Sequence, residues 1–168
     1  MKKMQKNLNK DNSPFYTLGI DPSFNIDEED LHEKYIEKQK KLHPDNFIEE
    51  SQKEAASTLS SKLNNAYEII KNPITRAKKY AEYVIGESID ESSIKTPQKL
   101  LFQAMEWQEM IEESSTKEAI EEVHKYAKNL FNKECHIFSQ SKENDLIESY
   151  IRMKYINRFI ENLESKLI

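Results

Sequence analysis

Residues 31–45, LHEKYIEKQKKLHPD, decide the fold of this chain. Leu31, Tyr35 and Leu42 have the spacing of an amphipathic helix. Pro44 cannot continue that helix, and a second amphipathic segment follows from about residue 51 to residue 70. The sequence therefore predicts a short, stiff and exposed corner between two packed helices, the kind of loop that commonly carries function.

Lys38 interrupts the apolar row of the first helix. Two arrangements are compatible with this pattern. The stem of Lys38 can lie along the core with its ammonium group at the surface, or the helix can be rolled so that Ile36 and Gln39 share the burial.

The composition favours helices throughout. Apolar residues make up 37% of the 168 residues and recur with helical spacing, and the sequence has no alternating runs of Val, Ile or Thr. The two glycines, Gly19 and Gly86, each follow an apolar run, where helices commonly end in the left-handed conformation. We therefore expect an all-α chain, long enough for one ordinary domain or two small ones.

Capping signals divide the chain into helices. Asp27 is a predicted N-cap, and Asn72-Pro73 has the residue types of an N-cap followed by the first helical position. Further helix starts are predicted at Ser51, Thr96 and Ser115. The resulting division is a disordered lead-in at 1–13, an N-terminal domain at 14–86, a polar linker at 87–95 and an antiparallel three-helix bundle at 96–168.

The charge distribution argues against nucleic acid as a partner. The formal net charge is −5; residues 1–86 carry 14 Lys/Arg against 14 Asp/Glu, and residues 87–168 carry 11 against 16. The whole deficit therefore lies in the second half, where phosphates would be repelled.

A membrane protein and a metal- or cofactor-binding protein are each disfavoured by one observation. No stretch approaches the ~20 apolar residues that a membrane helix needs, so no membrane partner is expected. Cys135 cannot form an internal disulfide, and with His124 and His136 it has no recognisable ligand spacing, so no metal site or cofactor is expected. A reducing compartment fits this pattern, with a bacterial cytoplasm favoured over a mitochondrial matrix because Met1 is present.

The helix before the corner carries a stripe of lysines. Lys34, Lys38 and Lys41 are spaced at i, i+4 and i+7, with Lys40 beside them. From composition alone this is a solvated helix face. An acid/base role for His43 and Asp45 is weaker still, because no nucleophile or apolar pocket is predicted beside them.

The corner and the helices around it resemble a known family of domains. The Lys-rich helix, His43-Pro44-Asp45 and a long antiparallel partner helix resemble the J-domain of DnaJ-type co-chaperones. Asn65-Ala66-Tyr67, Asn72-Pro73 and the run Arg76-Ala77-Lys78-Lys79-Tyr80 resemble one subfamily, the HscB co-chaperones of iron–sulfur cluster assembly. The likeness extends from about residue 15 to residue 168. It implies an N-terminal J-domain, built as an antiparallel helical hairpin with short helices, and a C-terminal three-helix bundle.

The resemblance also implies partners. A DnaK-class (HscA-like) chaperone ATPase would be bound and stimulated, and the chain itself would not be an enzyme. The residues implied in that contact are His43, Pro44, Asp45, Lys34, Lys38, Lys40 and Lys41. Two positions depart from the family pattern: Asn46 stands where members often carry Lys, and Lys38 stands where they are often apolar.

The helix from Pro97 carries a second constellation. Its core stripe is predicted at Leu100, Ala104, Trp107 and Ile111. Apolar and acidic residues outside this stripe predict a partner-binding patch, and the resemblance implies an IscU-like iron–sulfur scaffold as the partner. The residues implied are Leu101, Phe102, Met105, Glu106, Glu109, Glu113 and, from the last helix, Tyr155.

Other interpretations stay open. Phe102 could instead pack against the N-terminal domain or the linker. A J-domain co-chaperone for a different client, a helical nucleic-acid binder using the lysine stripe, and a hydrolase built on His43 and Asp45 are the rival functions.

Overall fold

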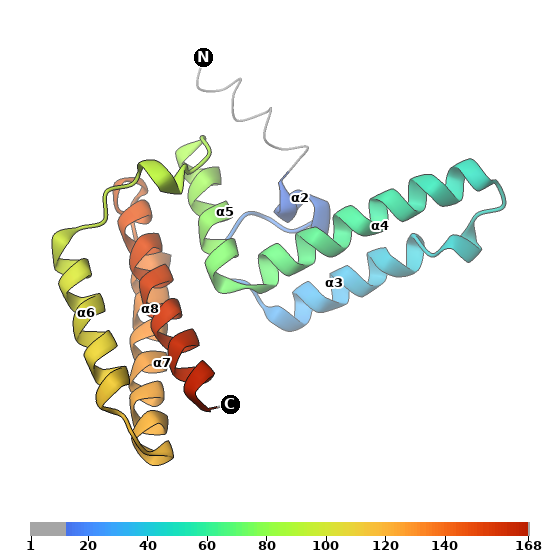
Figure 1. Ribbon diagram of the computed structural model, residues 1–168. Coiled ribbons are helices and arrows are strands. Elements are labelled where there is room, and N and C mark those ends of the chain that lie inside the picture. The colour runs from blue at the N-terminus through green and yellow to red at the C-terminus, as the bar shows by residue number, and fades with distance from the viewer. Residues whose placement is uncertain (1–12, 168) are drawn as a thin grey trace. The chain divides into compact units, whose positions relative to one another are not determined.

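The computed structural model describes residues 13–167, and every regular element in that range is helical, as the sequence predicts (Figure 1). The chain divides into two compact units, residues 1–88 and residues 89–168. The predicted lead-in at 1–13 lies outside the described residues except for Ser13. No helix of the described range is long and apolar enough to cross a membrane.

The first unit is a helical hairpin with short helices packed on it. Helix α3 (Glu28–Lys41) runs antiparallel to α4 (Glu50–Lys71), and the short turn η1 (Pro44–Asn46) lies in the connection between them. Helix α2 (Pro14–Leu18) packs on the hairpin, and α5 (Pro73–Ile85) follows α4. The core of this unit is built from Phe15, Leu18, Leu31, Leu63, Ala66 and Ile70.

Several predicted helix ends are confirmed. Asp27 accepts hydrogen bonds from the N–H groups of Glu29 and Asp30, and Asn72 caps α5 in the same way. Gly19 and Gly86 have φ angles of 73° and 83°, so each ends its helix in the left-handed region that favours glycine.

Three predicted starts are displaced. Helix α4 begins at Glu50 after the N-cap Glu49, so Ser51 lies inside the helix. Helix α6 (Gln98–Glu113) begins after Pro97 instead of Thr96. Helix α7 (Lys117–Gln140) is capped by Thr116, which accepts from the N–H of Ala119, instead of by Ser115.

Lys38 has a structural partner. Its half-buried side chain crosses to α2, where the ammonium donates a hydrogen bond of 2.7 Å to the Thr17 carbonyl oxygen. A Cβ at position 19 would lie 3.0 Å from Lys38 Nζ and would displace the end of this side chain, while the φ angle of 73° itself favours glycine. The first arrangement of Lys38 is therefore observed, with the ammonium bonded to a helix end instead of free. Ile36 and Gln39 are half-buried as well, as the second arrangement expects.

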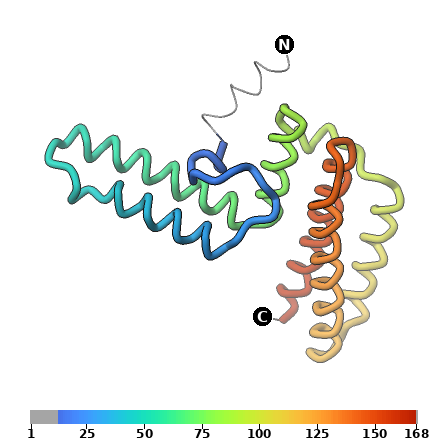
Figure 2. The backbone as a smooth tube through the Cα atoms, turned by 180° about the vertical axis from the view of Figure 1, so that it is seen from behind, coloured from blue at the N-terminus to red at the C-terminus, as the bar shows by residue number. Residues whose placement is uncertain are grey.

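The second unit is a bundle of α6 (Gln98–Glu113), α7 (Lys117–Gln140) and α8 (Leu146–Leu167), with the short turns η2 (Glu91–Ser93) and η3 (Glu143–Asp145) (Figure 2). Helices α7 and α8 pack along most of their length, and α6 packs mainly against α8. The rings of Trp107 and Phe159 stack with centroids 5.4 Å apart. In η2, Glu91 accepts a hydrogen bond from Tyr150 and pairs with Lys154. Part of the predicted linker is therefore fixed to the bundle.

A buried carboxylate ties α7 to α8. Glu134 is only 2% exposed; it accepts from the Ser149 hydroxyl at 2.8 Å and from Arg152 Nε at 3.2 Å. Since an unpaired buried charge is costly, Arg152→Leu alone is expected to lower the free energy of unfolding by about 3 kcal/mol. The Glu134→Leu/Arg152→Leu double variant should recover most of that loss.

Thermal and urea unfolding of the full chain would measure both effects. The matched control is the exposed pair Lys117–Glu121, at 3.9 Å, whose disruption should cost less than about 1 kcal/mol. Equal losses for the two pairs would contradict the role assigned to Glu134.

Candidate functional site

The His43-Pro44-Asp45 corner is a single tight turn. The extended backbone of His43 leads into η1, where the His43 carbonyl accepts from the Asn46 N–H at 3.0 Å. His43 Nδ1 accepts from the Asp45 N–H at 3.3 Å and lies 3.5 Å from Asp45 Oδ2. This assigns the proton of a neutral His43 to Nε2. The two side chains are 60% and 87% exposed, so the turn presents them for contact with another molecule.

Asn46 fixes this turn to α3. Its side-chain amide donates to the carbonyl oxygens of Lys40 at 2.8 Å and Lys41 at 3.4 Å. These carbonyls lie at the C-terminal end of α3, where helix partners are missing. Asn46 therefore contributes a capping contact to the end of α3 and carries no charge.

Asn46→Ala is expected to lower the free energy of unfolding by about 0.5–1.5 kcal/mol, because it removes this side-chain hydrogen bond. Urea unfolding would measure the change, with Asn144→Ala at another exposed turn position as the control. Unchanged stability of the Asn46 variant would show that the cap contributes nothing.

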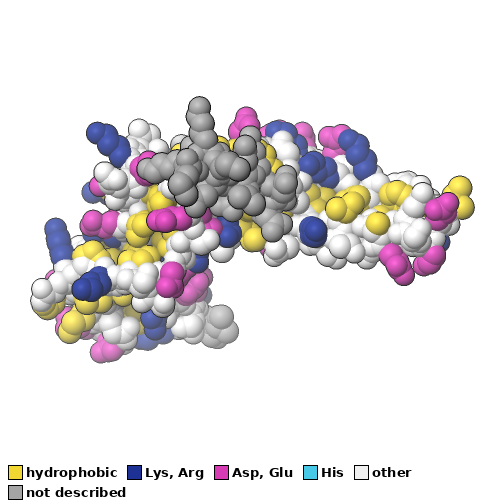
Figure 3. Space-filling model, turned by 90° about the horizontal axis from the view of Figure 1, so that it is seen from above, with side chains coloured by type: hydrophobic (Ala, Val, Ile, Leu, Met, Phe, Trp, Pro, Cys, Tyr) yellow, Lys and Arg dark blue, Asp and Glu magenta, His cyan; other side chains and the backbone are white. Residues whose placement is uncertain are grey.

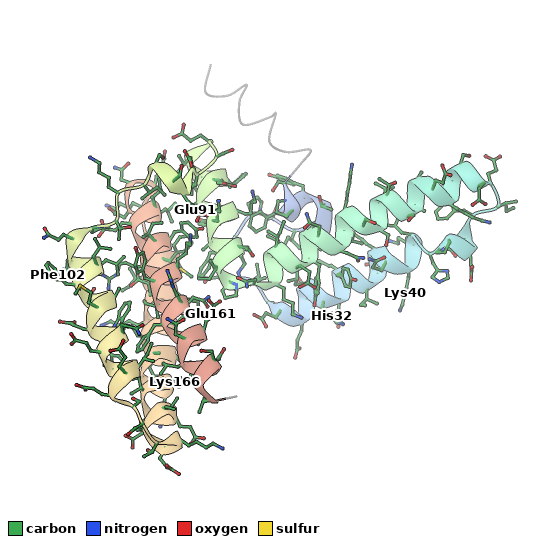
Figure 4. The ribbon with its side chains drawn as sticks, viewed as in Figure 1. His32, Lys40, Glu91, Phe102, Glu161 and Lys166 are labelled. Atoms are coloured by element: carbon green, nitrogen blue, oxygen red, sulfur yellow. The ribbon has the colours of Figure 1, made fainter. Side chains whose placement is uncertain are left out.

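Carboxylates offset the charge of some lysines in the predicted stripe but not of others. Lys34 pairs with Asp30 at 2.7 Å, and Lys41 pairs with Glu37 at 2.6 Å. The hydrogen bond from Lys41 lowers the pKa of the Glu37 carboxyl, so Glu37 remains an anion and offsets part of the stripe. Lys40 extends from α3 into solvent (Figure 4), and within the described residues its ammonium forms no ion pair.

Helical geometry separates these lysines. Lys34, Lys38 and Lys41 fall within about 60° of one another on α3, whereas Lys40 is turned from them by more than about 100°. The structure thus brings Lys40 and the His43 turn to the free end of the hairpin and directs Lys38 toward α2.

A polar seam between α3 and α4, formed by side-chain contacts across the hairpin, is not predicted from the sequence. The rings of Tyr35 and Tyr67 stack 4.2 Å apart, His32 Nδ1 lies 3.0 Å from the Tyr67 hydroxyl, and Tyr35 donates to Asn64. Gln39 also donates to Asn64. The sequence could have indicated these contacts, because polar and aromatic residues recur with helical spacing at positions 32, 35 and 39 of one helix and at positions 60, 64 and 67 of the other. This seam orients the helix that carries the corner.

The second predicted site is an exposed patch on α6. Leu101, Phe102 and Met105 are 44%, 57% and 61% exposed, and the carboxylates of Glu106, Glu109 and Glu113 are exposed around them. Figure 4 shows Phe102 on the side of α6 that faces away from α8. The opposite side holds the predicted core residues Leu100, Trp107 and Ile111, all buried, and the half-buried Ala104.

Tyr155 lies beside this patch. It is half-buried in a groove of about 170 Å³ between α6 and α8, and its hydroxyl is 3.3 Å from Thr96 Oγ1. Helical rotation places Leu101 and Met105 on the flank of α6 next to that groove. Leu101 and Met105 thus lie between this groove and Phe102, which is on the side of α6 away from α8 (Figure 4).

Among the described residues no group of His, Cys, Asp and Glu side chains could hold a metal ion. His124 instead lies 3.0 Å from Glu164, between α7 and α8, while Cys135 is half-buried and His136 is exposed.

Known proteins share this architecture. The family model described as "DnaJ domain" matches residues 13–80. A "Co-chaperone protein HscB homolog" of Haemophilus influenzae is 31% identical over 140 residues, which cover 82% of this chain and 78% of that protein. The chain belongs to the HscB family of co-chaperones. The HscB homolog of Pasteurella multocida is 28% identical over 158 residues, covering 90% of this chain and 91% of that protein.

Solved HscB structures share the fold. The crystal structure of human co-chaperone protein HscB superposes with a TM-score of 0.83 at 23% identity, covering 92% of this chain and 82% of that one. HscB from Vibrio cholerae gives a TM-score of 0.77 at 20% identity, covering 92% and 96%. The resemblance seen in the sequence is thus confirmed, and the chain is a J-domain co-chaperone.

Proposed function

We propose that this HscB-family chain binds an IscU-like iron–sulfur scaffold, delivers it to a DnaK-class (HscA-like) chaperone and stimulates ATP hydrolysis by that chaperone during iron–sulfur cluster assembly or transfer. The observation that carries the proposal is that one chain presents two exposed sites of different chemistry. One is the His43-Pro44-Asp45 turn, and the other is the apolar patch on α6 with its acidic rim.

The J-domain contact would use the turn as its centre. Pro44 fixes the backbone. Two backbone hydrogen bonds of η1, from the Asn46 N–H to the His43 carbonyl and from the Phe47 N–H to the Pro44 carbonyl, hold His43 and Asp45 in place, so little ordering entropy is lost on docking. Lys34, Lys38, Lys40 and Lys41 supply positive charge along α3. Since Lys40 is the one turned to solvent without an ion pair in the described range, it would contribute most to steering and to the salt dependence of association.

The client contact would be centred on α6. Phe102 and Met105 expose more than half of their side chains, and exposed aromatic and Met side chains are typical of binding centres. The rim carboxylates Glu106, Glu109 and Glu113 would select a basic surface on the scaffold. Leu101 would continue the contact toward Tyr155.

Joining the two contacts in one chain has a physical consequence. A scaffold held by the bundle is kept near the chaperone that the J-domain engages, which raises its effective concentration to the millimolar range for a short connection. ATP hydrolysis triggered by the turn would then coincide with the presence of the client.

The direct test is single-turnover ATP hydrolysis by a DnaK-class chaperone with and without the full chain. Stimulation is expected, and absence of stimulation by any such chaperone would contradict the proposal. The alternative, a J-domain co-chaperone for a different client, predicts stimulation together with no binding of an IscU-like scaffold by the full chain in calorimetry.

A further inference from the structure

A second apolar surface lies on the J-domain, beside the C-terminal end of α3. An open groove of about 440 Å³ runs where α3 and α4 meet the end of α2. Its apolar wall is formed by Leu42, Leu59 and Leu63, and its rim carries the ammonium groups of Lys38, Lys41 and Lys62. We call this surface the lysine-rimmed groove.

Leu59 shows why the groove is unfilled. Its spacing with Leu63 predicts a core position, yet Leu59 is 51% exposed while Leu63 is 2% exposed. Helix α2 is only five residues long and ends at Leu18, so it covers Leu63 but leaves the next turn of α4 open. Leu59 is thus an exposed position in the apolar row of α4, between the buried Ala56 and Leu63.

The rim has one sign of charge. Lys38 uses one donor on the Thr17 carbonyl and retains two others. Lys41 forms an ion pair with Glu37, which offsets part of its charge, whereas Lys62 forms no ion pair within the described residues. Three ammonium groups against one carboxylate leave the groove cationic around an apolar wall. In the face drawn in Figure 3, hydrophobic side chains are interspersed with lysines along the hairpin.

We propose that the lysine-rimmed groove binds an acidic segment of a partner protein, which inserts aliphatic side chains between Leu42 and Leu59 and places carboxylates on the lysine rim. Charge complementarity selects this occupant. The chain's own residues 1–12 carry four lysines and one Asp, so the rim would repel them. A nucleic acid would satisfy the lysines but not the leucines.

The groove shares Lys38 and Lys41 with the proposed ATPase contact, but its apolar wall and Lys62 are not part of that contact. Lys40 and the His43 turn are directed elsewhere on the hairpin, and neither lines the groove. Binding of a peptide here is measured without a chaperone or scaffold, so its failure is distinguishable from failure of the proposed function.

The probe is a fluorescein-labelled synthetic peptide of sequence EELLEELLEE, titrated with the full chain and followed by fluorescence anisotropy. Saturable binding is expected, weakening with salt because rim charges are screened. Two comparison peptides separate the contribution of charge from that of the apolar contact. KKLLKKLLKK reverses the charge, and EESSEESSEE removes the aliphatic groups. Each should bind at least about tenfold more weakly than the probe.

The variants test the location. Leu59→Asp and Lys62→Glu are each expected to weaken binding of the probe on the order of tenfold. Their matched controls are Ile137→Asp, at a similarly exposed apolar position, and Lys125→Glu, at an exposed lysine of α7; both should bind like the unchanged chain. Leu59→Ser serves if Leu59→Asp fails to fold, as judged by circular dichroism.

Three results would overturn the proposal. One is equal affinity of the unchanged chain and the Leu59 and Lys62 variants for the probe. Another is an equal loss in the α7 controls. The third is a tenfold gain in probe affinity when residues 2–12 are deleted, which would identify the chain's own N-terminal segment as the occupant.

Discussion

His43→Gln is expected to reduce stimulation of a DnaK-class ATPase to background while leaving scaffold binding unchanged. The imidazole is 60% exposed and its Nδ1 accepts the Asp45 N–H, so it is accessible for the proposed contact and also holds the turn. A glutamine can neither reproduce the rigid ring nor keep the same acceptor position. Loss of a central contact typically costs 2 kcal/mol or more, about thirtyfold or more in affinity.

The measurement is single-turnover hydrolysis over a range of co-chaperone concentrations. His136→Gln, at an exposed histidine of α7, is the control and should stimulate normally. Because His43 contributes nothing to the core, the melting temperature should change little. Retained stimulation by the His43 variant, or loss of scaffold binding with it, would contradict the proposed division of labour between the two units.

Leu101→Ala combined with Phe102→Ala is expected to weaken scaffold affinity by about 2–4 kcal/mol, because the two side chains form the apolar centre of the α6 patch. Stability should change little, since both side chains are substantially exposed in the free chain. Isothermal titration calorimetry gives the affinity, and thermal unfolding gives the stability.

The matched control for this pair is Tyr126→Ala with Ile137→Ala, two similarly exposed apolar residues of α7. It should bind the scaffold with unchanged affinity. A large fall in the melting temperature of the α6 variant would instead favour a packing role for Phe102. An equal loss in the α7 control would remove the assignment of the site to α6.

The sequence predicted best where a local rule decides the structure. Gly19 and Gly86 end helices because only a left-handed residue fits, and Asn72 caps α5 because its side chain reaches N–H groups two and three residues ahead. The exposed α6 patch was likewise visible from helical spacing alone, because an amphipathic helix has one buried side.

Prediction was wrong or incomplete where the partner is distant in sequence. Thr96 does not cap a helix because its hydroxyl lies against Tyr155, 59 residues away. Lys38 satisfies the end of α2, 21 residues earlier, and Glu134 is buried because α8 supplies Ser149 and Arg152. In each case the local sequence pattern allows more than one role for the residue, and contacts with a distant segment decide which role it has.

The central claim is that one chain couples a client to an ATPase through two separate surfaces. Its most direct test is single-turnover ATP hydrolysis by a DnaK-class chaperone with the scaffold present, comparing the unchanged chain, His43→Gln, and the Leu101→Ala/Phe102→Ala variant.

The unchanged chain should stimulate more with the scaffold than without it. The α6 variant should keep the scaffold-independent part of the stimulation and lose the remainder, and His43→Gln should lose both parts. Full stimulation by the α6 variant at limiting scaffold, or any stimulation by His43→Gln above background, would contradict the account.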